Sequence, residues 1–171
     1  MATPHNKKEK HDESYLCIKP TIWGLVYFLQ KNSSPGKFKE NTKMKKILIV
    51  DDSPDWINTH TFALKYHLGN QIEIDSVTSA KGGYQLIVSN LCVPYDIIIT
   101  DLSMENDFTP LYAGEWLIKQ IQFFKEYDLS RIFITSSIDE ISKIAGVYGV
   151  NFIPKDDCEN IMEYAIFTEI N

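Results

Sequence analysis

Two stretches of this chain, residues 46–50 (KILIV) and 95–100 (YDIIIT), are largely apolar and end directly before aspartates. A strand with one exposed face alternates apolar and polar residues, whereas an unbroken apolar run is typical of a strand covered on both faces. Strands of that kind occur mainly in parallel sheets with helices on both sides. This feature therefore predicts an α/β fold.

From Met44 onward, helical patterns alternate with short strand-like runs, as expected for stacked βαβ units. Five strand–helix pairs can be assigned, which indicates a doubly wound sheet. The predicted strands cover residues 46–50, 72–77, 95–100, 131–135 and 151–154, and the predicted helices cover residues 53–69, 80–89, 115–126, 140–148 and 158–167.

The composition is that of an ordinary globular chain, but its charge is unevenly distributed. Of 171 residues, 44% are hydrophobic and 23% are charged, which suffices for one core. Residues 1–46 carry a net charge of +6 and residues 47–171 carry −12, so we expect no nucleic-acid binding by the acidic part. Three widely spaced cysteines without a CxxC pair indicate a reducing compartment, and we expect a cytoplasmic protein.

Residues 1–43 are interpreted as a basic leader and linker, and residues 44–171 as the folded domain. The apolar run at residues 21–29 is far shorter than the ~20 residues of a membrane span, so no transmembrane span is expected. Pro20 precedes this run and no small-x-small cleavage site follows it, unlike in a signal peptide. The leader is either a disordered tether or an artefact of a start codon upstream of Met44.

Polar side chains stand at the ends of four of the predicted strands. Asp51 and Asp52 follow the first strand, and Asp101 follows the third. Thr135 ends the fourth strand, and Lys155 follows the fifth. The carboxyl ends of parallel strands lie along one edge of a sheet, where ligands bind. We therefore expect these side chains to converge.

Adjacent carboxylates at the end of a buried strand favour a proton or a cation. Two carboxylates ~4 Å apart repel by about 4 kcal/mol at an effective dielectric constant of about 20. Mg²⁺, or Mn²⁺, suits such oxygen ligands. The competing interpretation is a plain turn, with Ser53 as the N-cap of a helix and Pro54 as its first residue. That turn explains Ser53 and Pro54 but leaves Asp51 and Asp52 unexplained.

Phosphoryl transfer to a carboxylate would use every member of this set. Asp101 is the candidate nucleophile, and the three aspartates are the candidate metal ligands. Lys155 and Thr135 would stabilise the negative charge on the oxygens of the transferred group.

The residues resemble the receiver domain of two-component response regulators, and the resemblance extends over residues 44–171. The matching motifs are ILIVDD, IIITDLSM, IFITSS and FIPK, each at a predicted strand end. The intervals are 49 residues from Asp52 to Asp101, 34 to Thr135 and 20 to Lys155, which suit βα units. The resemblance implies a five-stranded parallel sheet in the flavodoxin-like order 2-1-3-4-5 with five flanking helices.

By the same resemblance, the metal ligands and the phosphoacceptor can be assigned. Asp52 would bind Mg²⁺ directly and Asp51 through water, and the backbone carbonyl of Ser103 would complete the protein ligands. Asp101, also close to the metal, would carry the phosphoryl group.

The resemblance further implies a switch made of Thr135 and Phe152. On phosphorylation the hydroxyl would move toward the phosphate and the aromatic ring would turn inward. The simpler interpretation of Phe152 is a core residue. Trp56 and Trp116 are interpreted as helix-packing residues.

Two local departures from the receiver pattern lie near the site. Glu105 stands where receivers usually have proline, and residues 106–113 form a longer loop before Gly114. This loop either selects a partner or shields the phosphate, or it is a plain surface insertion. Asp156 follows Lys155 in place of the usual cis proline.

We expect a stand-alone, chemotaxis-type receiver that is not an enzyme in the usual sense. A histidine kinase or phosphotransfer protein would donate the phosphoryl group, and an output protein would be contacted. A phosphorylation-dependent dimer through helix four, strand five and helix five is compatible with this role. The alternatives are a Mg²⁺-dependent phosphatase resembling the haloacid dehalogenases, with Asp51 as nucleophile, and a degenerate receiver that serves as a docking module.

Overall fold

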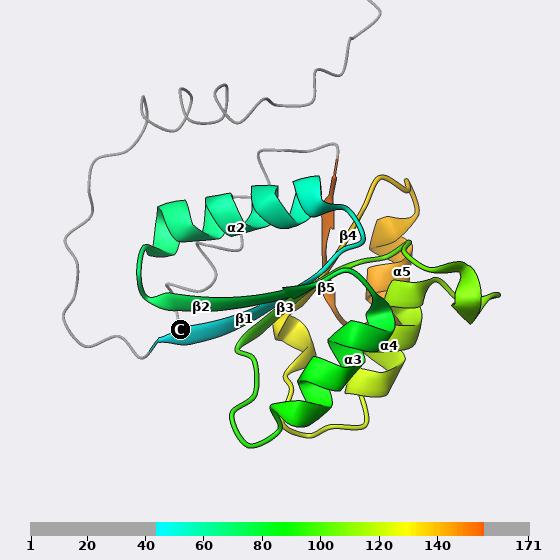
Figure 1. Cartoon of the computed structure of the whole chain (residues 1–171). Coiled ribbons are helices and arrows are strands. Elements are labelled where there is room, and N and C mark those ends of the chain that lie inside the picture. Colours follow the sequence, from blue (N-terminus) through cyan, green and yellow to red (C-terminus); the bar gives the residue numbers. More distant parts are fainter. Residues whose placement is uncertain (1–43, 156–171) are drawn as a thin grey trace, which may run out of the picture. The chain divides into compact units, whose positions relative to one another are not determined.

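The computed structural model describes residues 44–155 and shows one parallel sheet with helices on both faces (Figure 1). The strand order is β2-β1-β3-β4-β5, which confirms the predicted order. The strands are β1 (Lys45–Val50), β2 (Ile72–Val77), β3 (Ile97–Asp101), β4 (Ile132–Ser136) and β5 (Asn151–Pro154).

Four α-helices and two short 3₁₀ helices connect the described strands. The predicted fifth helix, residues 158–167, lies outside the described residues. The α-helices are α2 (Pro54–Leu68), α3 (Ala80–Ser89), α4 (Ala113–Ile121) and α5 (Ile141–Tyr148), and the 3₁₀ helices are η1 (Asn106–Phe108) and η2 (Leu129–Arg131).

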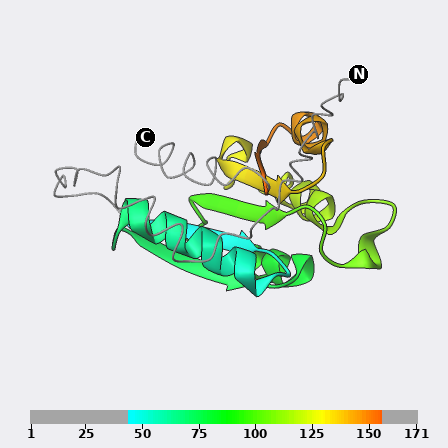
Figure 2. The same ribbon diagram turned by 90° about the horizontal axis from the view of Figure 1, so that it is seen from above.

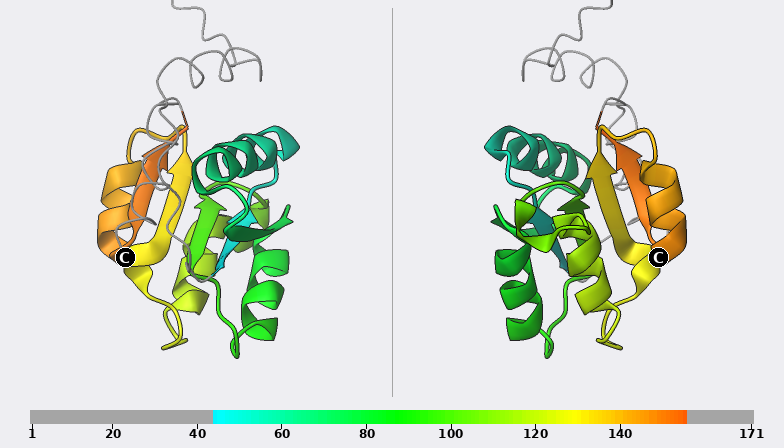
Figure 3. Two further views of the ribbon diagram at one scale, coloured as in Figure 1. Left: turned by 90° about the vertical axis from the view of Figure 1, so that its left-hand side faces the viewer. Right: turned by 90° about the vertical axis from the view of Figure 1, so that its right-hand side faces the viewer.

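The side chains of β1 alternate between two hydrophobic clusters, as expected for a strand covered on both faces. Ile47 and Ile49 pack with residues of α2, whereas Leu48 and Val50 pack with residues of α3, α4 and α5. Figures 2 and 3 show the corresponding layers, with α2 on one face and the other three helices on the opposite face. All four side chains are fully buried, which confirms the prediction of a strand covered on both faces.

The predicted boundaries hold for α2, α3, β2 and β5 within about one residue, but the helix predicted over 115–126 is wrong at both ends. Helix α4 begins at Ala113 and ends at Ile121. Beyond it, Phe123 N–H donates to Gln120 O and Phe124 N–H to Ile121 O, so the backbone turns away from the helix. Apolar residues continue past this turn, which is why the pattern suggested a longer helix.

Within residues 44–155, no helix combines the length and the apolar character that crossing a membrane requires.

Candidate functional site

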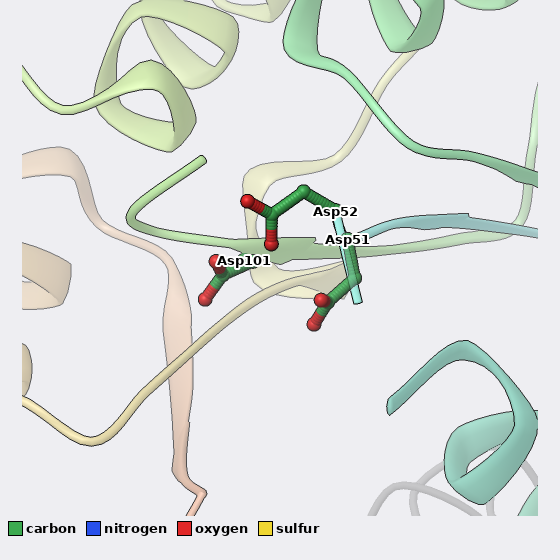
Figure 4. A group of neighbouring side chains, drawn as sticks. All are labelled: Asp51, Asp52 and Asp101. Carbon is green, nitrogen blue, oxygen red and sulfur yellow. The ribbon is translucent and has the colours of Figure 1, made fainter. Parts of the chain in front are cut away.

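Three carboxylates meet at the carboxyl edge of the sheet, as the sequence predicted (Figure 4). Asp51 follows β1 directly and Asp101 is the last residue of the neighbouring strand β3. Asp51, Asp52 and Asp101 each offer an oxygen atom within 4.8 Å of the others. Asp51 and Asp101 are buried, and Asp52 is exposed. The cluster thus has two buried charges and one side open to solvent.

Strand register brings the cluster together. Val50 pairs with Thr100 across β1 and β3, so the two strands end level with each other. The turn that follows β1 supports Asp51, because its Oδ1 accepts a hydrogen bond from Ser53 N–H at 2.9 Å. Ser53 is the N-cap residue of α2 and Pro54 its first residue, as predicted, but the Ser53 side chain makes no capping hydrogen bond.

Lys155 reaches the buried carboxylates from the end of β5. Its Nζ lies 2.9 Å from Asp51 Oδ2 and 3.0 Å from Asp101 Oδ1, and its side chain is 9% exposed. Its backbone N–H donates to Ser136 O at 2.8 Å, which fixes the chain at this point. The peptide bond to Asp156, where the sequence departs from the receiver pattern, lies outside the described residues.

Trp56 contributes to the site in a way that was missed from the sequence. Its ring centroid lies 5.2 Å from Lys155 Nζ, at the distance of a cation–π interaction. The indole also packs against a core cluster, so the helix-packing interpretation was correct but incomplete. The available signal was its position in the first turn of α2, four residues after Asp52.

His60 lies one further turn along α2, with its ring centroid 5.8 Å from that of Trp56. Burial, and secondarily the Lys155 ammonium, lower the pKa of His60 to about 3. The imidazole is therefore neutral near pH 7, and Lys155 is the cation that faces the buried carboxylates.

The electrostatics of Asp101 fit a cation site. Burial raises the pKa of its carboxyl to about 6, the Lys155 ammonium opposes this rise, and the nearby charges of Asp51 and Asp52 add to it. One ammonium therefore does not fully compensate the three carboxylates. Clustered carboxylate oxygens with an unmet demand for positive charge are what Mg²⁺ or Mn²⁺ binds in proteins, so the residues present fit a divalent cation.

Thr135 lies beside Asp101 in the sheet and is fully buried. Within residues 44–155, its Oγ1 has no hydrogen-bond partner. A buried hydroxyl without a partner is costly and is available to a group that enters the site.

The segment after Asp101 is held from two sides. Leu102 N–H donates to Thr135 O at 2.9 Å, and Leu102 O accepts from Gly114 N–H at 3.0 Å. A Cβ atom on Gly114 would lie 2.3 Å from Asp101 O, so only glycine permits this approach. Ser103, the predicted carbonyl ligand, is the next residue along the chain and is exposed.

Phe152 lies on β5 beside Ile134 of β4. Its side chain is 43% exposed, so the alternative interpretation as a core residue is wrong for this conformation.

No protein-family model and no curated protein sequence matches the chain. Many solved structures, in contrast, are similar to this chain. A response regulator receiver domain from Rhodospirillum rubrum has a TM-score of 0.60 at 14% identity, covering 74% of this chain and 94% of that chain.

Two further matches have similar scores. The receiver domain of the histidine kinase CKI1 from Arabidopsis thaliana has a TM-score of 0.57 at 20% identity, covering 75% of this chain and 92% of its own. The isolated REC domain of RcsB from Salmonella enterica serovar Typhimurium has a TM-score of 0.55 at 17% identity, covering 76% and 91% respectively. Identities this low establish the fold alone, and the part of this chain that the structure describes has the receiver-domain fold.

Proposed function

We propose that this chain is a phosphoacceptor signalling protein in which Asp101 takes up a phosphoryl group in a reaction that requires Mg²⁺. A histidine kinase or a phosphotransfer protein would be the donor. The observation that carries the proposal is the placement of Lys155 Nζ within 3.0 Å of both Asp51 and Asp101, inside a cluster of three carboxylates on a receiver fold.

Asp51, Asp52, Asp101 and the backbone carbonyl of Ser103 would hold the cation. When bound, it would neutralise the carboxylates and offset the negative charge of the phosphoryl oxygens. An oxygen of Asp101 attacks phosphorus as the bond from phosphorus to the donor breaks, and the donor leaves with that bonding pair. With acetyl phosphate as donor, the leaving group is acetate.

Two side chains are placed to follow the charge as it moves onto the phosphoryl oxygens. The Lys155 ammonium already lies 3.0 Å from Asp101 Oδ1, so it is close to the carboxylate on which the new charge develops. The Thr135 hydroxyl is buried beside Asp101 and can donate a hydrogen bond to an incoming oxygen.

The exposed ring of Phe152 supports a role in passing the signal on. Phe152 of β5 pairs with Ile134 of β4, and Thr135 is the residue that follows Ile134 in β4. A shift of Thr135 toward a phosphoryl group would alter the wall against which the ring can pack, giving two states that differ at the surface. An output protein that reads this surface would bind one state better than the other.

The direct test is incubation with Mg²⁺ and acetyl phosphate, followed by mass spectrometry. We expect a hydroxylamine-labile adduct of about 80 Da on Asp101, and none in EDTA. An Asp101→Asn protein that acquires the same adduct would refute the assignment. Steady release of phosphate from many monoesters, abolished by Asp51→Asn, would favour the phosphatase alternative instead.

A further inference from the structure

Glu105 connects the loop after β3 to the start of α3. Its Oε1 and Oε2 accept from the backbone N–H of Ala80 at 2.9 and 3.0 Å. Ala80 is the first residue of α3, and the N-cap Ser79 accepts separately from Gly82 N–H at 3.1 Å. A carboxylate is favoured at the positive end of a helix, and its hydrogen bonds are stronger than neutral ones.

This contact and the anchors of Leu102 bracket a very short segment. Leu102 is fixed on one side by Thr135 O and Gly114 N–H, and Glu105 is fixed on the other by Ala80. Only Ser103 and Met104 lie between these two points. The two anchors together limit the conformations that the backbone of Ser103 can adopt.

The longer loop is also held at a second point, by Phe108. Phe108 stacks on Trp116 of α4 with ring centroids 4.5 Å apart, and the Lys81 ammonium lies 5.5 Å from the Phe108 centroid. These contacts hold the distal part of the loop. Phe108, which makes them, lies three residues after Glu105 in the sequence. Glu105 adds a hydrogen bond to the start of α3 at a point closer to Ser103 than the contact between Phe108 and Lys81.

We propose that Glu105 is a positioning residue for the cation site, which it serves by holding the Ser103 carbonyl toward Asp51, Asp52 and Asp101. Among the described residues, the acids whose oxygens cluster as possible cation ligands are Asp51, Asp52 and Asp101, whereas the Glu105 carboxylate accepts from Ala80 N–H. The inference rests on the proposed function, in which the Ser103 carbonyl is a ligand. Removing such a supporting contact weakens metal binding without removing a ligand.

The test is calorimetric titration of the full chain with Mg²⁺. Glu105→Ala should weaken Mg²⁺ binding by about 10-fold, the low end of the range for supporting contacts. Glu105→Gln keeps an acceptor oxygen for Ala80 N–H, so its Mg²⁺ affinity should stay within about two-fold of the wild-type affinity. Glu73→Ala, which removes an equal charge from the start of β2, is the matched control and should leave the affinity unchanged.

Unfolding in EDTA and hydrogen exchange of the Ala80 amide are measured on the same proteins. Ala80 should exchange faster in Glu105→Ala and at the wild-type rate in Glu105→Gln. Unchanged Mg²⁺ affinity in Glu105→Ala would overturn the inference, as would a Glu105→Gln affinity as weak as that of Glu105→Ala. A wild-type protein that binds no Mg²⁺ would instead refute the proposed site itself, whatever the exchange data show for the Glu105 contact.

Discussion

The metal-free protein should become more stable when Asp101 is replaced by asparagine. Burial and the neighbouring acids raise the pKa of Asp101 from its ordinary value of 3.8 to about 6. Ionised Asp101 therefore opposes folding, by about 3 kcal/mol at a pH well above 6. Asparagine has nearly the same shape, cannot ionise and keeps an oxygen that can accept from Lys155 Nζ, but it loses the charge attraction of this 3.0 Å contact. We expect a net gain of about 1–2 kcal/mol at pH 8.

The pH dependence has a definite sign. Because the folded-state pKa is higher than the unfolded one, folded Asp101 binds more protons between pH 3.8 and about 6. The wild-type protein should therefore lose stability relative to Asp101→Asn as the pH rises through this window, and the difference should level off above it. Below the unfolded pKa the contribution of Asp101 is at its most favourable.

Urea unfolding in EDTA at pH 5 and pH 8, followed by circular dichroism, measures both quantities. Asp52→Asn is the matched control, because Asp52 is exposed and should give a smaller gain. An Asp101→Asn protein that is less stable than wild type at pH 8, or equally stabilised at both pH values, would refute the reasoning about the buried carboxylates. Saturating Mg²⁺ should stabilise the wild type and reduce the difference.

Three further substitutions test separate contacts. Gly114→Ala should lower the free energy of unfolding by at least about 3 kcal/mol, because the added Cβ would lie 2.3 Å from Asp101 O. A loss below about 1 kcal/mol in urea unfolding would contradict this close approach. Lys155→Met should destabilise the metal-free protein by about 3 kcal/mol at pH 8, since two buried carboxylates lose their shared cation; equal stability of the two proteins in EDTA would contradict it. Trp56→Leu should slow labelling of the protein by acetyl phosphate by a few-fold, because it removes a cation–π contact with Lys155 worth ~0.5–1 kcal/mol, whereas Trp56→Phe should retain most of the rate. A wild-type labelling rate in Trp56→Leu would exclude a role for the indole.

The sequence by itself determined the class of fold and the members of the acid cluster. Strands β1 and β3 could be predicted because an apolar run buried on both faces is a local pattern. Gly69 likewise predicted the end of α2, and in the structure it adopts a φ of 59°, which favours glycine. Parallel strands align their carboxyl ends, so residues at the ends of β1 and β3 had to approach one another whatever the details of packing. Because of that constraint, the sequence alone predicts that Asp51 and Asp101 lie close together.

Contacts between distant segments were decided only by the tertiary structure. The position of Trp56 beneath Lys155 joins residues 99 apart, and the hydrogen bonds of Glu105 to Ala80 join residues 25 apart. The early end of α4 and the outward position of Phe152 also depend on what neighbouring elements leave room for. Side-chain direction and helix length follow from packing, which no local period encodes. The chemistry of the site was therefore legible in the sequence, whereas the residues that hold it in place became visible only when the sheet and helices were assembled.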